Sequence, residues 1–143
     1  MTSAYGSDLV VDLLRAVGIA HVALNPGATF RGLHDSLVNH GKGDPELILT
    51  LHEEIAVALA HGYAKARGAP MAAAVHDIVG LQHASMAIFN AFCDRVPILV
   101  LGATGPMDAA RLGVAVGERD RDLLVQREDQ LRVALAVVDE RVV

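Results

Sequence analysis

The chain has 143 residues, of which 52% are hydrophobic and 20% charged, and this composition suits one well-filled globular domain and excludes a disordered chain. A formal net charge of -5 argues against nucleic acid or an anionic membrane as the main partner. The single cysteine, Cys93, cannot form an internal disulfide, and with no signal-peptide pattern or membrane-length apolar run we expect a cytoplasmic protein.

Apolar strand-like runs alternate with helical patterns along the first hundred residues. The predicted elements, by residue number, are a helix at 7–17 capped by Ser7, a strand at 19–24, a helix after the cap Thr29, a strand at 47–51, a helix at 52–67, a strand at 71–75, a helix at 80–92 and a strand at 98–101. Fully apolar strands that alternate with helices are typical of an α/β fold. We therefore predict three layers, with a mainly parallel sheet of four to six strands and helices on both faces.

The character of the sequence changes near its C-terminus. Residues 1–111 are predicted to form the domain, whereas 112–143 form an atypical charged tail. A dense charged stretch at 118–129 precedes an apolar run at 131–138, which fits either a helix followed by a strand or a loosely attached tail. We interpret the tail as a truncated or diverged end of the same domain.

Polar residues follow three of the predicted strands. They are Asn25-Pro26-Gly27, His52-Glu53-Glu54 and His76-Asp77. Ligands of open α/β sheets bind at the carboxyl ends of the strands, so we expect Asn25, Glu53 and His76 to lie on one rim of the sheet.

Each of these residues also has a purely structural interpretation. Glu53 and Glu54 could simply interact with the positive end of a helix. Glu53 differs because it adjoins a strand end and an apolar segment, so we expect burial to raise its affinity for a proton. His76 could be a structural hydrogen-bond donor or an acid–base group. The histidine spacing predicts no metal site, and neither a GxGxxG nor a GxxxxGK[ST] motif is present.

Four separated motifs resemble one known domain. His52–Ala64 (HEEIAVALAHGYA) resembles the "HE…A…GYA" signature of the pyrimidine-binding (Pyr) domain of thiamine-diphosphate enzymes, which include acetolactate synthase and benzoylformate decarboxylase. Asn25-Pro26-Gly27 resembles the PG turn after the first strand, and Gly68-Ala69-Pro70 the link into the third. Asn90–Val100 resembles the "NA…PVLV" stretch. The resemblance implies a Pyr-type fold for residues 1–111.

The resemblance also implies a mechanism. The family glutamate, which falls on Glu53, hydrogen-bonds N1′ of the aminopyrimidine and favours the 4′-imino tautomer, which deprotonates thiazolium C2. The resulting ylide attacks a 2-keto acid. Asn25, Pro26 and Gly27 would bind the cofactor. His76 falls where benzoylformate decarboxylase-like members have an active-site histidine, and the missing "GPG" turn favours a decarboxylase or lyase-like relative over acetolactate synthase proper.

The chain lacks the family's "GDG…N" motif, which holds Mg²⁺ and the diphosphate. We therefore expect a homo- or hetero-oligomer in which a partner domain supplies that site, and no activity for the chain alone. The chain could be a natural single-domain subunit or a truncated or frame-shifted product. Two alternatives stay open: a non-catalytic Pyr-like dimerisation module or gene remnant, and a doubly wound domain for another small ligand.

Overall fold

The computed structural model describes residues 5–77, 79–103 and 133–138, and these form a five-stranded sheet in the order β2-β1-β3-β4-β5. The first four strands run parallel to their neighbours, and β5 runs antiparallel to β4. The strands are β1 (His21–Leu24), β2 (Glu46–Leu49), β3 (Met71–Val75), β4 (Ile98–Ala103) and β5 (Val133–Val138). The mainly parallel α/β fold predicted from the sequence is confirmed.

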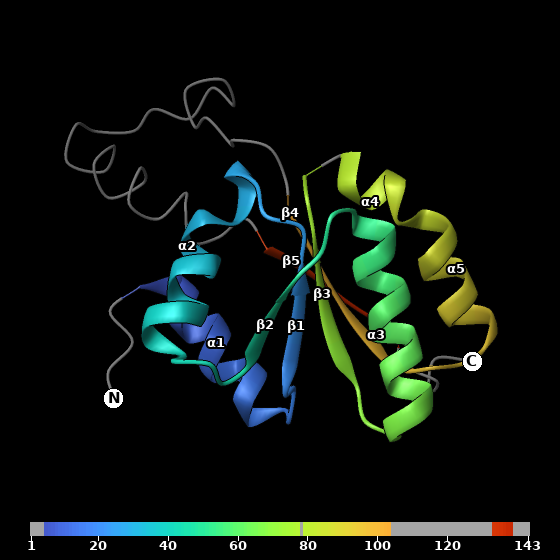
Figure 1. Ribbon diagram of the computed structural model, residues 1–143, viewed down its shortest axis with the longest axis horizontal. Helices are drawn as coiled ribbons and strands as arrows, with labels where there is room; N and C mark the ends of the chain where they lie inside the picture. Colours follow the sequence, from blue (N-terminus) through green and yellow to red (C-terminus); the bar gives the residue numbers. More distant parts are fainter. Residues whose placement is uncertain (1–4, 78, 104–132, 139–143) are drawn as a thin grey trace, which may run out of the picture.

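Helices lie on both sides of this sheet (Figure 1). One side carries α1 (Gly6–Ala16), the short 3₁₀ turn η1 (Ala28–Phe30), α2 (Arg31–Asp35) and its π-helical extension η2 (Ser36–His40). The other side carries α3 (Glu53–Arg67), α4 (Val79–His83) and α5 (Ser85–Cys93). The arrangement is the predicted three-layer sandwich.

Alternation along the strands divides the core into two clusters. In β3, Ala72 and Ala74 face the α1–α2 side, whereas Met71, Ala73 and Val75 face the α3–α5 side. Successive side chains of a strand point to opposite faces, so a fully apolar strand contributes to both clusters. On the α3 side, the small side chains of Ala73 in β3 and of Ala56 and Ala60 in α3 leave room for the helix to lie close to the strand. That approach brings the first residue of α3 near the end of the strand.

Several predicted boundaries hold and others do not. Strand 71–75 is confirmed, and Gly68 ends α3 with a left-handed φ of 67° as expected for that glycine. The predicted helix at 80–92 is wrong as one unit, because the chain breaks at Ala84 into α4 and α5. Ser7 is also wrong as a cap: it lies inside α1, where its buried hydroxyl accepts a hydrogen bond from Ser36. Such a long-range bond leaves no local signal in the sequence.

Two predictions concern residues outside the described part of the chain. The glycine-containing turn after β4 continues into 104–106, and the charged stretch at 118–129 lies beyond it. The apolar run at 131–138 corresponds to β5, which joins the same sheet as the other strands. In the part of the chain that the structure describes, no helix has the length and apolar character needed to cross a membrane.

Candidate functional site

Three strand ends meet at one rim of the sheet. Asn25 directly follows β1, His76 directly follows β3, and Glu53 begins α3 after the short segment that follows β2. The Glu53 carboxylate accepts hydrogen bonds from the Asn25 side-chain amide and from the backbone N–H of His76. The expectation that these three residues lie together is therefore met, although they come from separate segments of the sequence.

Glu53 and Glu54 are adjacent, yet their environments differ. Glu53 is buried, with 6% of its surface exposed, whereas 45% of the Glu54 side chain is exposed. Side chains of neighbouring helical residues point about 100° apart, so only one of the pair can face the strand ends. Glu53 is the one that faces them, because its carboxylate accepts hydrogen bonds from Asn25 after β1 and from the backbone of His76 after β3.

The charge state of Glu53 differs from the prediction. Burial acts to raise the pKa of the Glu53 carboxyl and is the largest single effect on it. Hydrogen bonds from its own backbone N–H and from Asn25 and His76, together with the nearby His83 ring, hold that pKa below its ordinary value of 4.5. The expected gain in proton affinity is thus wrong for this chain by itself, because the sequence pattern revealed the apolar surroundings but not the donors.

Two glycines allow close packing around this carboxylate. A Cβ atom on Gly80 would lie 2.9 Å from Cβ of His76 and 3.0 Å from both Cγ and Oε1 of Glu53. A Cβ atom on Gly27 would lie 2.8 Å from Cδ2 of His76. Real Cβ atoms essentially never come closer than 3.0 Å to a heavy atom of a non-neighbouring residue, so a Cβ at either glycine would force part of this arrangement to shift. Pro26, the remaining residue of the turn, is exposed to solvent.

His76 is held by a hydroxyl and a carboxylate. The Thr29 hydroxyl lies 2.9 Å from Nε2 of His76, and Oδ1 of Asp77 lies 2.5 Å from Nδ1. Thr29 also donates to Asp77 over 3.3 Å. The ring therefore has a polar partner at each nitrogen, and its orientation is fixed at the rim. The sequence pointed to Thr29 only as a helix cap and gave no sign of its contact with His76.

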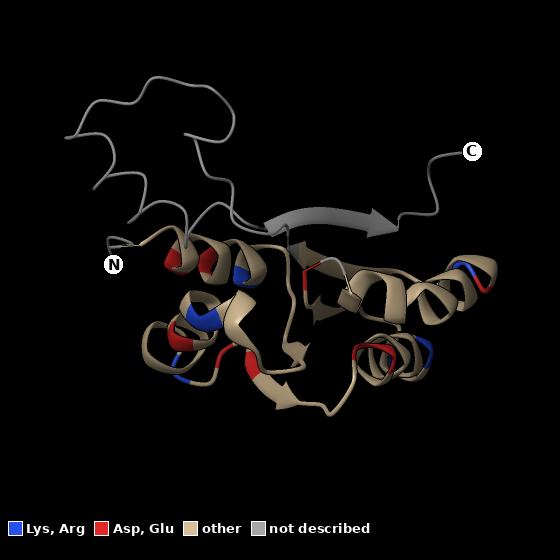
Figure 2. Cartoon of the chain, turned by 90° about the horizontal axis from the view of Figure 1, so that it is seen from above, with Lys and Arg blue, Asp and Glu red and all other residues tan. Residues whose placement is uncertain are grey.

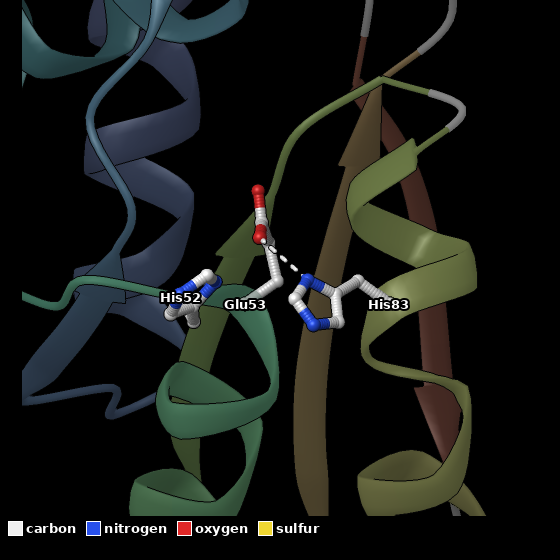
Figure 3. A group of neighbouring side chains, drawn as sticks. All are labelled: His52, Glu53 and His83. Carbon is white, nitrogen blue, oxygen red and sulfur yellow. Dashed lines mark ion pairs between the residues drawn. The ribbon is translucent and has the colours of Figure 1, made fainter.

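Two further histidines, His52 and His83, flank Glu53. His52 precedes α3 and His83 ends α4, and Figure 3 shows the Glu53 side chain between their two rings. Nδ1 of His83 lies 3.8 Å from Oε2 of Glu53, and its Nε2 lies 2.5 Å from Oε2 of Glu54. The spacing in the sequence gave no sign of this group, because His52 and His83 lie at the ends of two different helices.

Comparisons with known proteins place this chain in a family. Residues 4–127 match the model of the thiamine pyrophosphate (thiamine diphosphate) enzymes, specifically the N-terminal TPP-binding domain. The chain belongs to this family. It is similar to acetolactate synthase large subunits of Haemophilus influenzae, at 33% identity over 101 residues, and of Lactococcus lactis, at 33% over 107. These matches cover 71% and 74% of the chain but only 17% and 18% of the relatives, so it spans less than a fifth of their length.

Solved structures of decarboxylases share the fold. The 4-hydroxybenzoylformate decarboxylase of Rhodococcus jostii matches with a TM-score of 0.62 and 25% identity, over 86% of this chain and 23% of that one. The benzoylformate decarboxylase of Polynucleobacter necessarius matches with a TM-score of 0.63 and 22% identity, over 80% and 20%. The family domain therefore relates to both acetolactate synthases and decarboxylases, in agreement with the resemblance found in the sequence motifs.

Proposed function

We propose that this chain binds the aminopyrimidine of thiamine diphosphate and activates it through Glu53, within a 2-keto-acid decarboxylase or carboligase whose diphosphate and Mg²⁺ are held by a separate domain. The observation that carries the proposal is the Glu53 carboxylate, buried at the rim where β1 and β3 end and positioned by Asn25 and His76. When bound, the cofactor supplies the electron sink for decarboxylation.

The residues present fit the aminopyrimidine. A ring nitrogen that shares a proton with a carboxyl needs an oriented carboxyl group and little water, and Glu53 offers both. Gly27 and Gly80 let the backbone pack directly against His76 and Glu53, which helps to hold the carboxylate in one place at the rim. Asn25 donates to the Glu53 carboxylate and holds it in place.

The surface beside the rim suits a partner domain. The sequences of α4 (VGLQH) and α5 (SMAIFNAFC) contain no Lys, Arg, Asp or Glu, and these helices are tan in Figure 2. Large apolar side chains are exposed on α3, α4 and α5, namely Ile55, Leu59, Val79, Leu81, Met86, Phe89 and Phe92. Large exposed apolar surfaces are typical of protein–protein interfaces. We propose that the diphosphate-binding domain covers this surface.

Coverage by a partner would also change the state of Glu53. In the chain by itself, donated hydrogen bonds hold the pKa of Glu53 below its ordinary value despite burial. A partner that excludes more water strengthens the effect of burial, which favours the protonated form. A carboxyl group that shares its proton with a ring nitrogen needs that form. The proposed function therefore depends on assembly in two ways: the partner domain holds the diphosphate, and it shifts Glu53 towards its protonated form.

His76 is proposed as a catalytic residue that faces the substrate from the same rim. Its ring is about one-third exposed, and Thr29 and Asp77 fix its orientation. An imidazole with a fixed orientation and access to solvent can donate a proton to, or accept one from, a substrate bound beside the cofactor.

The test compares three glutamate variants in the complex with a diphosphate-binding partner. The readout is hydrogen–deuterium exchange at C2 of the bound cofactor. Glu53→Gln keeps the shape but cannot share a proton, so we expect a loss of about a hundred-fold or more. Glu54→Gln is expected to lose far less, because that side chain turns away from the strand ends. Glu46→Gln, at the opposite end of the sheet, is the control and should match wild type.

Two outcomes would contradict the assignment. If Glu54→Gln is the crippled variant, the wrong glutamate has been selected. If neither variant slows exchange while the cofactor remains bound, the domain acts as a non-catalytic dimerisation module, which is the alternative that the sequence left open.

A further inference from the structure

His52, Glu53 and His83 form a compact group of side chains that bind metals. Each offers one ligand atom, and these atoms all lie within 4.8 Å of one another. Two imidazoles and one carboxylate are the ligands that Zn²⁺ and related divalent ions prefer, whereas Mg²⁺ and Ca²⁺ select sites built from oxygen ligands. No other group of this kind appears among the described residues.

The dimensions of the group require only side-chain rotation. Zn–N and Zn–O bonds of about 2.0–2.2 Å place the ligand atoms of a tetrahedral site roughly 3.3 Å apart. Nδ1 of His83 already lies 3.8 Å from Oε2 of Glu53. The His52 and His83 side chains are exposed, and their ring centroids lie 5.0 Å apart. Both rings can therefore turn inward around the fixed Glu53 carboxylate, which lies between them in Figure 3.

The neighbouring Glu54 orients His83 for this role. Nε2 of His83 lies 2.5 Å from Oε2 of Glu54. If Nε2 carries the ring proton, the lone pair of Nδ1 faces the Glu53 carboxylate, and two electron-rich groups then oppose each other beyond hydrogen-bond distance. A cation between them removes this repulsion. A carboxylate behind a ligating histidine is the usual arrangement at zinc sites.

The charges around this group act in both directions, and the two nearby carboxylates favour a cation. The positive end of α3 opposes a cation. Two carboxylates, Glu53 and Glu54, lie at the same place and act in the opposite direction. In the absence of a cation, His83 could instead carry a proton on both nitrogens and pair with both carboxylates, and the experiment below separates these states.

We infer that His52, Glu53 and His83 bind a divalent transition-metal ion of the Zn²⁺ class, and that this ion competes with the aminopyrimidine for the Glu53 carboxylate. The second half rests on the proposed function, because it needs Glu53 to be the carboxyl that the aminopyrimidine engages. A divalent cation bound to one carboxylate oxygen lowers the proton affinity of the whole group, so the carboxyl no longer shares a proton with a ring nitrogen. Zinc would thus act as an inhibitor of cofactor activation.

Metal binding is tested on the full 143-residue chain without cofactor. Titration with Co²⁺ should give visible absorption bands of tetrahedral coordination at one ion per chain, and Zn²⁺ should displace the cobalt. His52→Ala and His83→Ala should each weaken binding at least ten-fold, and Glu54→Gln about 10- to 100-fold. His34→Ala, a histidine outside the group, is the control. Because His52 and His83 are exposed, circular dichroism should confirm that both variants stay folded.

Other outcomes overturn the inference. Binding that is unaffected by His52→Ala and His83→Ala would place the metal elsewhere. A specific site is expected to bind cobalt with a dissociation constant below about 100 µM. If the wild-type chain binds no cobalt at that concentration, the site does not exist. Nitrogen NMR signals of the His83 ring that do not change when Zn²⁺ is added would exclude His83 as a ligand.

Competition is tested separately in the assembled complex. Zn²⁺ should slow C2 exchange of bound cofactor in wild type, and the ratio of rates with and without Zn²⁺ should return towards one in His83→Ala. If the chain binds zinc but exchange is unaffected, the competition is refuted while the metal site stands. If Glu53→Gln leaves exchange intact, the proposed function fails, and the cobalt titration still decides the site.

Discussion

The tight contact at Gly80 provides a test of the site that needs neither cofactor nor partner. The perturbation is Gly80→Ala, which places a methyl group 2.9 Å from Cβ of His76 and 3.0 Å from Oε1 of Glu53. The Glu53 carboxylate is the end of a flexible side chain and can move. Cβ of His76 is attached directly to the backbone, so relief there requires the chain after β3 to shift.

The magnitude follows from two opposing effects. Overpacking by one methyl group in a filled site costs about 1–3 kcal/mol. Replacement of glycine by alanine within a helix gains about 0.5–1 kcal/mol through backbone entropy. Gly62→Ala is the matched control, because Gly62 lies in α3 and an added Cβ there meets nothing within 4 Å. Taking the difference between the variants removes most of the helix contribution, so Gly80→Ala should be about 1–3 kcal/mol less stable than Gly62→Ala.

Urea unfolding of the two purified variants and the wild-type chain measures this difference. We expect the free energy of unfolding of Gly62→Ala to be above that of wild type, and that of Gly80→Ala to be equal to or below it, with similar m-values for all three. If Gly80→Ala is as stable as Gly62→Ala, His76 and Glu53 do not approach Gly80 closely, and the site geometry described above is wrong.

Two further predictions concern other contacts. Thr29→Val removes the hydroxyl that lies 2.9 Å from Nε2 of His76, so nitrogen NMR should show a change in the tautomer population of that ring and urea unfolding a loss of about 0.5–1.5 kcal/mol; an unchanged His76 spectrum would contradict the contact. The hydrogen bond from Lys65, its charge and the nearby His61 hold the pKa of Asp94 below its ordinary value of 3.8. Its stabilising effect is therefore present above that value and lost as the pH falls through the lower folded pKa, so Asp94→Asn should flatten the acid limb of stability measured between pH 6 and 2, and parallel limbs would refute it.

The sequence predicts the fold and part of the rim for the same reason. Apolar strands such as Met71–Val75 carry a local signal, and parallel strands bring their carboxyl ends to one edge. Asn25, Glu53 and His76 could therefore be placed together before any contact was known. Thr29 could not, because its contact with His76 joins residues 47 positions apart and depends on how η1 approaches β3.

The charge of Glu53 shows a different limit of the sequence. The apolar residues that follow it correctly indicated burial, and burial is indeed the largest single effect on its pKa. The direction of the net shift depends on how many donors reach the carboxylate, and Asn25 and the His76 backbone come from two other strand ends. The local sequence pattern thus predicts how buried a side chain is better than it predicts which hydrogen-bond donors reach it.

What covers the rim therefore decides what Glu53 does. In the chain by itself the carboxylate is ionised and lies beside two exposed imidazoles, which suits a divalent cation. A domain seated on the apolar surface of α3, α4 and α5 would exclude water, raise the proton affinity of Glu53 and screen the rim from ions in solution. The two states use the same carboxylate in opposite protonation states. The proposed metal site of the uncovered chain and the proposed proton-sharing site of the assembled one would thus exclude each other, because both need the Glu53 carboxylate.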